Sequence, residues 1–331
     1  ISLDERQFYS DLDGDGVRTC EPLLAGRYLC EAVGERSTSM LGASLIYSTL
    51  DSRLRPTRGE NATLNLDFAG LGGSTRYARI TADAAKYWNL GSGFIFSVRG
   101  QGGFIKGLKD RGPGQDDVLL TDRFFLGEQQ GLRGFDIRGV GPRVVRRFWI
   151  PGETAGDPPA LTPLGDDSTV DDALGGTAMY LASAELEIPL GSGARELGLR
   201  PSLFVDVGSV FNVARPTLNN DCKYPDGCFL PSRDENGAQL YSQPVRDAAG
   251  NITGYEVVTN PTSTDATALG TTLPPFVEEF YGDTWKPRLS VGLGVNWNSP
   301  FGPFRINIAY PLLKQEGDDT KLFSFNVGTQ F

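Results

Sequence analysis

The segment KLFSFNVGTQF, residues 321–331, decides the fold that this sequence predicts. Its side chains alternate between two kinds along the whole segment. Since successive side chains of a β-strand point to opposite faces, this period of two predicts a strand with one apolar and one polar face. The apolar face would carry Phe323, Phe325, Val327, Thr329 and Phe331, and the other face Ser324, Asn326, Gly328 and Gln330.

Other segments predict strands in the same way. In residues 61–69, for example, alanine, leucine and phenylalanine alternate with asparagine, threonine and aspartate. Short connections rich in glycine or proline, such as 89–93 and 299–303, separate several segments, which is typical of an antiparallel meander. Residues 1–10 could add the end of a further strand. The predicted strands are 39–50, 61–69, 76–89, 94–105, 177–190, 199–212, 286–298, 304–312 and 321–331.

Charged residues occur in the middle of these strands, at Asp67, Glu185, Glu187 and Asp206. The core of a soluble β-sandwich would reject such residues unless they were paired. In a transmembrane barrel, by contrast, the polar faces line a wet lumen while the apolar faces meet lipid. The strands also have the length of about ten residues that crosses a bilayer at a tilt. We therefore interpret the fold as all-β, an antiparallel transmembrane β-barrel, with a soluble sandwich as the alternative.

The number of predicted strands, about nine, is odd, whereas bacterial single-chain barrels have even numbers. An open sheet would also leave two unpaired edges in lipid. The sequence begins at Ile1, with neither an initiator methionine nor a signal peptide, which indicates a mature segment or a fragment. We therefore expect the chain to be the C-terminal portion of a larger barrel.

The composition argues against several classes of function. The chain has 331 residues, a formal net charge of −10 and no histidine. The negative charge gives no basic footprint for nucleic acid. Without histidine the chain lacks the commonest general base and metal ligand. The sequence therefore predicts neither an enzyme nor a cofactor.

The four cysteines fall into two close pairs, Cys20 with Cys30 and Cys222 with Cys228. Neither pair has the spacing of a CxxC metal site, and both lie in polar segments rich in turn-forming residues. We interpret them as two local disulfides, Cys20–Cys30 and Cys222–Cys228, formed in an oxidising compartment, with free thiols as the alternative.

Asp11, Asp13 and Asp15 resemble the start of a calcium-binding loop, with glycine at the sixth position. Position twelve would be Pro22, however, where such a loop needs a bidentate glutamate, and no helical pattern flanks the segment. An acidic, solvated turn is therefore the preferred interpretation. The sequence predicts no metal site, and a calcium site at these three aspartates is a weak alternative.

A glycine-rich stretch, GLRGFDIRGVGPR at residues 131–143, interrupts the strand pattern. Glycine allows positive φ and close approach of other groups, and arginine offers a planar set of donors that suits carboxylates. We interpret the stretch as a compact loop that carries Arg133 to a defined place. An ordinary glycine-rich surface loop is the alternative.

Several motifs follow one another in a characteristic order. They are Leu132-Arg133-Gly134-Phe135, Gly141-Pro142-Arg143, and the segments 171–176, 204–208, 299–303 and 323–331. From about residue 38 onward, their order, spacing and flanking strands resemble the BamA family of outer-membrane β-barrel assembly factors.

This resemblance implies that residues 38–331 are the C-terminal part of a sixteen-stranded barrel. Residues 1–37 would form an extracellular loop with a possible strand end. Residues 108–176 would contain a loop inserted into the lumen, and residues 213–285 a further extracellular loop. The family's POTRA domains and first strands would precede Ile1.

The resemblance also implies two functional sites. In the first, Arg133 of the Arg133-Gly134-Phe135 motif would bind Glu185 and Asp206 and so hold the loop in the lumen. Both carboxylates also fall on the predicted polar faces of adjacent strands, where hydrated lumen residues are the alternative. The second site is the final strand, which would carry a C-terminal recognition signal and close a weak seam through Phe323, Phe325, Val327, Gly328 and Phe331.

The function implied by the resemblance is the folding and insertion of β-barrel proteins in the bacterial outer membrane by strand templating at the seam. The expected partners are unfolded outer-membrane β-barrel proteins, outer-membrane lipid and, through the POTRA domains, the lipoproteins of an assembly complex. A translocation module like the related TamA family and a passive outer-membrane channel are the alternatives.

Overall fold

The computed structural model describes residues 9–10, 19–20, 23, 26–27, 30, 37–53, 55–111, 116–152, 154, 157–190, 198–234, 238–299 and 302–327. These residues belong to two compact units. One unit comprises Glu35–Val145, Ala173–Thr217 and Phe280–Phe331, and the other comprises Ile1–Gly34, Arg146–Asp172 and Leu218–Glu279.

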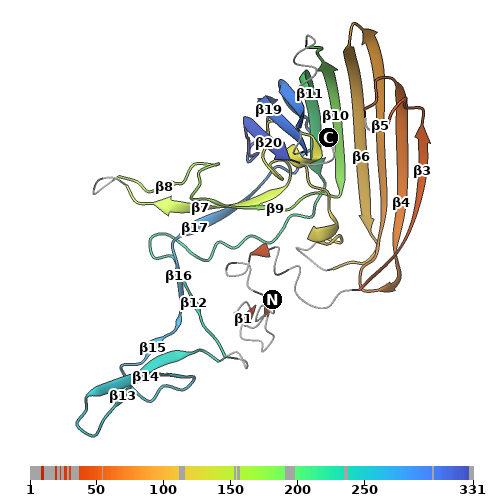
Figure 1. Cartoon of the computed structure of the whole chain (residues 1–331). Helices are drawn as coiled ribbons and strands as arrows, with labels where there is room; N and C mark the ends of the chain where they lie inside the picture. Colours follow the sequence, from red (N-terminus) through yellow and green to blue (C-terminus); the bar gives the residue numbers. More distant parts are fainter. Residues whose placement is uncertain are drawn as a thin grey trace. The chain divides into compact units, whose positions relative to one another are not determined.

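The first unit contains a single antiparallel sheet of nine strands, in the order β20-β19-β18-β11-β10-β6-β5-β4-β3. Figure 1 shows these strands side by side in one curved sheet. The predicted all-β antiparallel fold is therefore confirmed. The strands are β3 (Thr38–Ser48), β4 (Gly59–Gly73), β5 (Tyr77–Gly91), β6 (Phe94–Gly107), β10 (Ala178–Glu187), β11 (Leu199–Phe211), β18 (Arg288–Ser299), β19 (Gly302–Leu313) and β20 (Phe323–Val327).

The two faces of this sheet differ in the way that the alternation predicts. On one face, which we call the outer face, large apolar side chains are exposed, for example Leu293 (57%) and Ile308 (59%). On the opposite, inner face, Phe204 and Asp206 are buried. The exposed row on the outer face is what a lipid-facing sheet requires, because lipid and not protein would cover it.

The carboxylates in the middle of the strands lie on the inner face and form ion pairs with arginines; they are Asp67, Glu185, Glu187 and Asp206. Asp67 stands directly opposite Arg79, and their side chains form an ion pair of 2.9 Å between Oδ2 and Nε. Asp83 and Arg99 form a similar pair of 3.1 Å. Such pairs satisfy groups that a purely apolar face could not accommodate.

Two edges bound the sheet. Within the described residues, β3 pairs only with β4, and β20 pairs only with β19. The described strands thus form a partial barrel and not a closed one.

The connection between β3 and β4 is organised by a single carboxylate. The Asp51 side chain accepts hydrogen bonds from the hydroxyl and the backbone N–H of Thr57 and from the N–H of Arg58. These bonds, with that from the Thr57 hydroxyl the largest cause, lower the pKa of Asp51 from 3.8 to about 2.

Replacing Thr57 by valine is expected to raise the Asp51 pKa back toward its ordinary value, because the hydroxyl bond favours the ionised form. NMR titration of the carboxyl carbon measures this shift. Because the folded-state pKa is lowered, the bonds stabilise the turn above pH 3.8 and are lost as the pH falls through about 2. Thr49→Val is the control, since Thr49 binds Glu60 in the same turn and not Asp51. An unchanged Asp51 pKa in Thr57→Val would contradict the assignment.

The second unit contains several small sheets where the sequence predicted only a polar insertion. Its strands are too short and too rich in polar residues and proline for a period of two to be detected. Cys222 and Cys228 form the predicted disulfide beside them, with Cα atoms 4.5 Å apart. The strands between residues 213 and 285 are β12 (Cys228–Pro231), β13 (Tyr241–Arg246), β14 (Ile252–Val258), β15 (Thr267–Ala268), β16 (Gly270–Leu273) and β17 (Phe276–Tyr281).

Strand β7 (Arg143–Ile150), with sequence RVVRRFWI, was also missed by the sequence analysis. It pairs with β8 (Ala160–Leu161), β9 (Val170–Ala173) and β17. Its three arginines obscure the alternation, although its β-branched and aromatic residues favour a strand. In the second unit the buried carboxylate of Glu278 binds both Arg27 and Arg146, at 2.7 and 3.1 Å.

Several predictions concern residues that the structure does not describe. They are the weak calcium site at Asp11, Asp13 and Asp15, the side chain of Cys20 in its predicted pair with Cys30, and Gly328 and Phe331. Nearby, β1 (Tyr9–Ser10) pairs with β2 (Thr19–Cys20) in a separate two-stranded sheet. In the part of the chain described, no helix is long and apolar enough to cross a membrane.

Candidate functional site

The glycine-rich loop, residues 131–143, packs against the inner face of the nine-stranded sheet. It follows a short 3₁₀ helix, η3 (Glu128–Gln130), and buries Leu132 and Phe135 completely. These two side chains form one apolar cluster with Leu181 of β10 and Val210 of β11. Burial of this apolar surface stabilises the loop on the sheet.

Arg133 lies between these apolar anchors and binds two carboxylates on adjacent strands. Its guanidinium makes a bidentate contact with Asp206 of β11, with Nε–Oδ2 at 2.6 Å and Nη2–Oδ1 at 2.7 Å. Its Nη1 donates to Glu185 Oε2 of β10 at 2.9 Å. The Arg133 and Asp206 side chains are 6% and 0% exposed, so this is a buried, charge-assisted contact.

A second arginine, Arg305 of β19, binds Glu185 from the other side. Its Nη2 lies 3.0 Å from both carboxylate oxygens. Ser202 also donates to Glu185, and Ser183 donates to Asp206. The site thus contains two arginines and two carboxylates with their hydrogen bonds largely satisfied, which offsets the cost of burying the charges.

The aromatic ring of Phe204 on β11 packs against the guanidinium of Arg133. The Arg133 Cζ atom lies 3.4 Å from the ring centroid, a cation–π contact. The ring has room because its neighbour on β18 is Gly292, where a Cβ atom would come within 2.5 Å of Phe204. Gly134 in the loop has φ +89°, and its Cβ would crowd Ser290 and Ala309. The close approach therefore depends on glycine on both the loop and the strand.

The same loop is hydrogen-bonded to residues 314–322, the connection between β19 and β20, which we call the hairpin before β20. The Asp136 N–H donates to the Asp319 carbonyl at 3.1 Å, and the Lys321 N–H donates to the Gly134 carbonyl at 3.1 Å. Deeper on the inner face, Asn326 of β20 donates to Glu128 Oε1 at 2.7 Å. The loop thus contacts β10, β11 and the connection before β20, and η3, which precedes the loop, is bonded to β20 itself.

A buried ion pair holds the base of this hairpin. Arg288 of β18 binds both oxygens of Asp318 at 3.0 Å, and both side chains are fully buried. Arg288 also donates to the Ser209 hydroxyl and to the Thr284 and Gly282 carbonyls. It therefore joins strands β11 and β18 to the connection before β20.

In the predicted seam strand, Phe323, Phe325 and Val327 lie on the outer face, and each is more than half exposed. Ser324 and Asn326 lie on the inner face. The structure therefore brings Arg133, Gly134 and Phe135 together with Glu185 and Asp206, while the described seam residues form a separate row at the sheet edge.

Sequence analysis did not single out Arg305, Arg288, Asp318, Glu128 or Asn326 as residues of a site. It placed Asn326 on the polar face of its strand, and the alternation of residues 304–312 could have placed Arg305 on the same face. Nothing in the sequence pattern indicated which partners they would have.

The Omp85 superfamily domain matches residues 18–331 of this chain. The chain belongs to the Omp85 superfamily. Its relatives include the outer membrane protein assembly factor BamA of Neorickettsia risticii, 26% identical over 97% of this chain and 30% of that protein. The assembly factor BamA of Neisseria meningitidis is 25% identical over 85% of this chain and 27% of that protein. The chain thus spans less than a third of the length of either relative.

Among solved structures, the chain resembles BamA from Haemophilus ducreyi lacking POTRA domains 1–3. The two share a TM-score of 0.52 and 20% identity, over 86% of this chain and 41% of the other. At this identity the likeness shows the fold alone. The superfamily match and the two assembly-factor relatives confirm the resemblance to the BamA family, and this Omp85 chain is a protein of the bacterial outer membrane.

Proposed function

We propose that this Omp85 protein folds and inserts β-barrel proteins in the outer membrane, with the edge of β20 as the template for substrate strands. The observation that carries the proposal is the position of β20 at the end of the sheet, where within the described residues it pairs only with β19 and presents an apolar outer row. An unpaired strand edge presents backbone N–H and C=O groups that can add another strand. An incoming strand would satisfy these groups in lipid, where no water is available.

The ion pairs of Arg133 with Glu185 and Asp206, which we call the loop lock, have a positioning role in this proposal. Arg133 holds the loop on the inner face through Asp206 and Glu185, and the loop in turn holds the hairpin before β20. A loop kept in the lumen supports an assembly factor over a passive channel, since it occupies space that a solute would need. The residues in the lock would therefore be Arg133, Gly134, Phe135, Glu185 and Asp206.

The proposed partners follow from the same mechanism. Unfolded outer-membrane β-barrel proteins would supply the added strands, and outer-membrane lipid would surround the outer face. Assembly-complex lipoproteins would bind through POTRA domains elsewhere in the protein. The names of the relatives, which describe outer membrane protein assembly factors, support these assignments.

Site-specific photo-crosslinking tests the proposal. A benzoylphenylalanine at Phe325 of β20 is expected to crosslink to a urea-denatured barrel protein while that protein folds into proteoliposomes. Phe325 lies at the edge, whereas Ile308 of β19 is similarly exposed but is paired with Leu293 of β18 and with Phe323 of β20. Ile308 is therefore the matched control position. Equal crosslinking from both positions, or none from Phe325, would refute templating at β20.

A further inference from the structure

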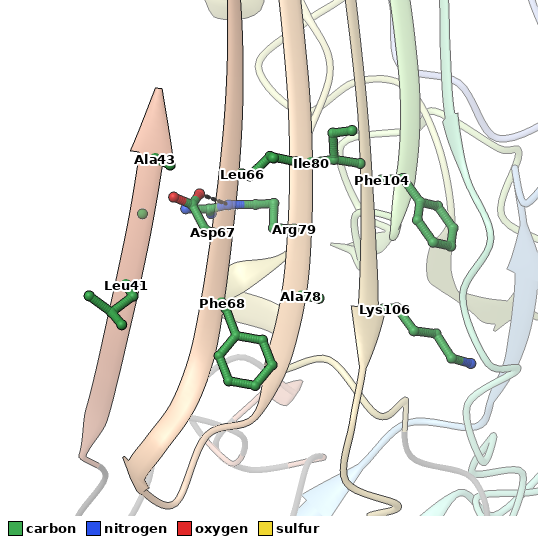
Figure 2. A pocket seen from close by; sticks show the side chains of 11 residues that line it. Leu41, Ala43, Leu66, Asp67, Phe68, Ala78, Arg79, Ile80, Phe104 and Lys106 are labelled. Carbon is green, nitrogen blue, oxygen red and sulfur yellow. Dashed lines mark hydrogen bonds and ion pairs between the residues drawn. The ribbon is translucent and has the colours of Figure 1, made fainter. Parts of the chain in front are cut away.

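A depression of about 520 Å³ opens on the outer face of β3, β4, β5 and β6 (Figure 2). Two rows of side chains from paired strands line it. The strand register places Phe68, Ala78 and Lys106 in the row nearer the 108–176 connection, and Leu66, Ile80 and Phe104 in the next row.

The shape of the depression follows from the sizes of these side chains. Ala78 is small and forms a low point between Phe68 and the stem of Lys106, while Ile80 and Phe104 continue the apolar surface in the next row. Phe68, Ile80 and Phe104 are each more than 40% exposed. An elongated apolar surface of this kind suits an acyl chain, whose burial is favourable in proportion to the area covered.

Positive charge lies at one end of the depression. Lys106 is exposed, and Arg76, two residues before Ala78 and immediately before β5, is exposed as well; its carbonyl accepts a hydrogen bond from the Leu108 N–H. Lys106 and Arg76 are therefore diagonal neighbours, about 7–8 Å apart at the backbone, which long side chains can bridge. Arg76 also shares the face of Phe68, because a Cβ at Gly70 would contact both side chains.

Within the described residues, neither Lys106 nor Arg76 forms an ion pair. The other cations of these strands do have partners. Lys86, at the opposite end of β5 on the same face, binds Glu60 at 2.9 Å, and Arg79 binds Asp67 on the inner face. The two cations beside the depression are thus available to an external anion.

We propose that this outer-face depression binds a phosphorylated membrane lipid, with an acyl chain over Ala78 and Ile80 and the phosphate between Lys106 and Arg76. The lipid combines the two chemistries that the depression presents, an apolar chain and an adjacent anion. Phosphate is a strong acceptor for both lysine and arginine. The proposal depends on the outer face lying in lipid and is independent of strand templating.

Native mass spectrometry of the protein released from nanodiscs tests this site. The nanodiscs contain equal amounts of phosphatidylglycerol and phosphatidylcholine, and the measured quantity is the ratio of the two lipids retained. The wild-type protein is expected to prefer phosphatidylglycerol. The double substitution Arg76→Gln with Lys106→Gln is expected to lower this preference about fivefold for each cation removed.

Two further variants separate the parts of the site. Ala78→Leu fills the depression and is expected to reduce retention of both lipids while the cations stay in place. Lys86→Gln is the matched control, because Lys86 is on the same face but already paired, and its lipid preference is expected to match the wild type. Heat-modifiable electrophoretic migration verifies that each variant is folded.

The proposal is overturned if the double variant keeps the wild-type preference, or if Lys86→Gln loses it to the same extent. Excess inorganic phosphate provides the remaining arm of the experiment. A lipid site retains phosphatidylglycerol in its presence, because the acyl chain contributes to binding. Complete loss of the preference would identify free phosphate as the ligand and refute the lipid site.

Discussion

Replacement of Arg133 by alanine is expected to destabilise the bound loop by about 3–5 kcal/mol, because it leaves Asp206 buried without its ionic partner. Glu185 keeps Arg305, so the loss falls mainly on Asp206 and on the loop itself. Hydrogen exchange of the backbone amides in residues 131–143 measures the release. If the proposed function is correct, assembly of a denatured barrel protein in proteoliposomes slows as well.

Two variants sharpen this test. Arg133→Lys retains the charge but cannot reproduce the bidentate contact with Asp206, so an intermediate effect is expected. Arg99→Ala is the matched control, since Arg99 also faces inward and binds an aspartate but is 53% exposed at its side chain. Its contribution should be about 1 kcal/mol or less. Unchanged exchange in Arg133→Ala would show that the apolar anchors hold the loop without the ion pair.

Replacement of Asp318 by alanine is expected to cost a similar amount, about 3–5 kcal/mol, because Arg288 would remain charged in a fully buried position. The four other acceptors around Arg288, one hydroxyl and three carbonyls, are neutral and cannot replace the carboxylate. The hairpin before β20 would loosen as a result. Chemical denaturation in lipid vesicles gives the loss of stability, and amide exchange in residues 315–322 gives its location.

The neighbouring residue provides the control for this prediction. Asp319 is exposed, and its described contacts with the loop are made by its backbone, so Asp319→Ala should change stability little. A comparable loss in Asp319→Ala would mean that side-chain removal anywhere in the turn has the same effect. The expected contrast between adjacent aspartates therefore isolates the buried ion pair.

The substitutions of Arg133 and Asp318 both break buried ion pairs that hold the loop and the hairpin before β20 on the sheet. Arg133 connects the loop to β10 and β11, while Arg288 connects β18 to the hairpin that the loop also contacts. Because residues in one network are not additive, combining the two substitutions should give a coupling energy different from zero.

The sequence by itself determined the strands and their two faces. In β20, β10 and β11 the period of two is enough, because backbone geometry sends successive side chains to opposite sides whatever the rest of the chain does. It was therefore possible to place Glu185 and Asp206 on one face of adjacent strands. The strand β7 was missed because its arginines conceal that period.

Only the tertiary structure decided which side chains of the site contact one another. Arg305 is 120 residues from Glu185 in the chain, and Asn326 is 198 residues from Glu128. No local pattern encodes such separations, since each contact depends on the sheet register and on the path of the loop across it. The resemblance of the motif suggested where Arg133 would bind, but the second arginine, the aromatic support of Phe204 and the bonds to the terminal hairpin arise from packing between distant segments.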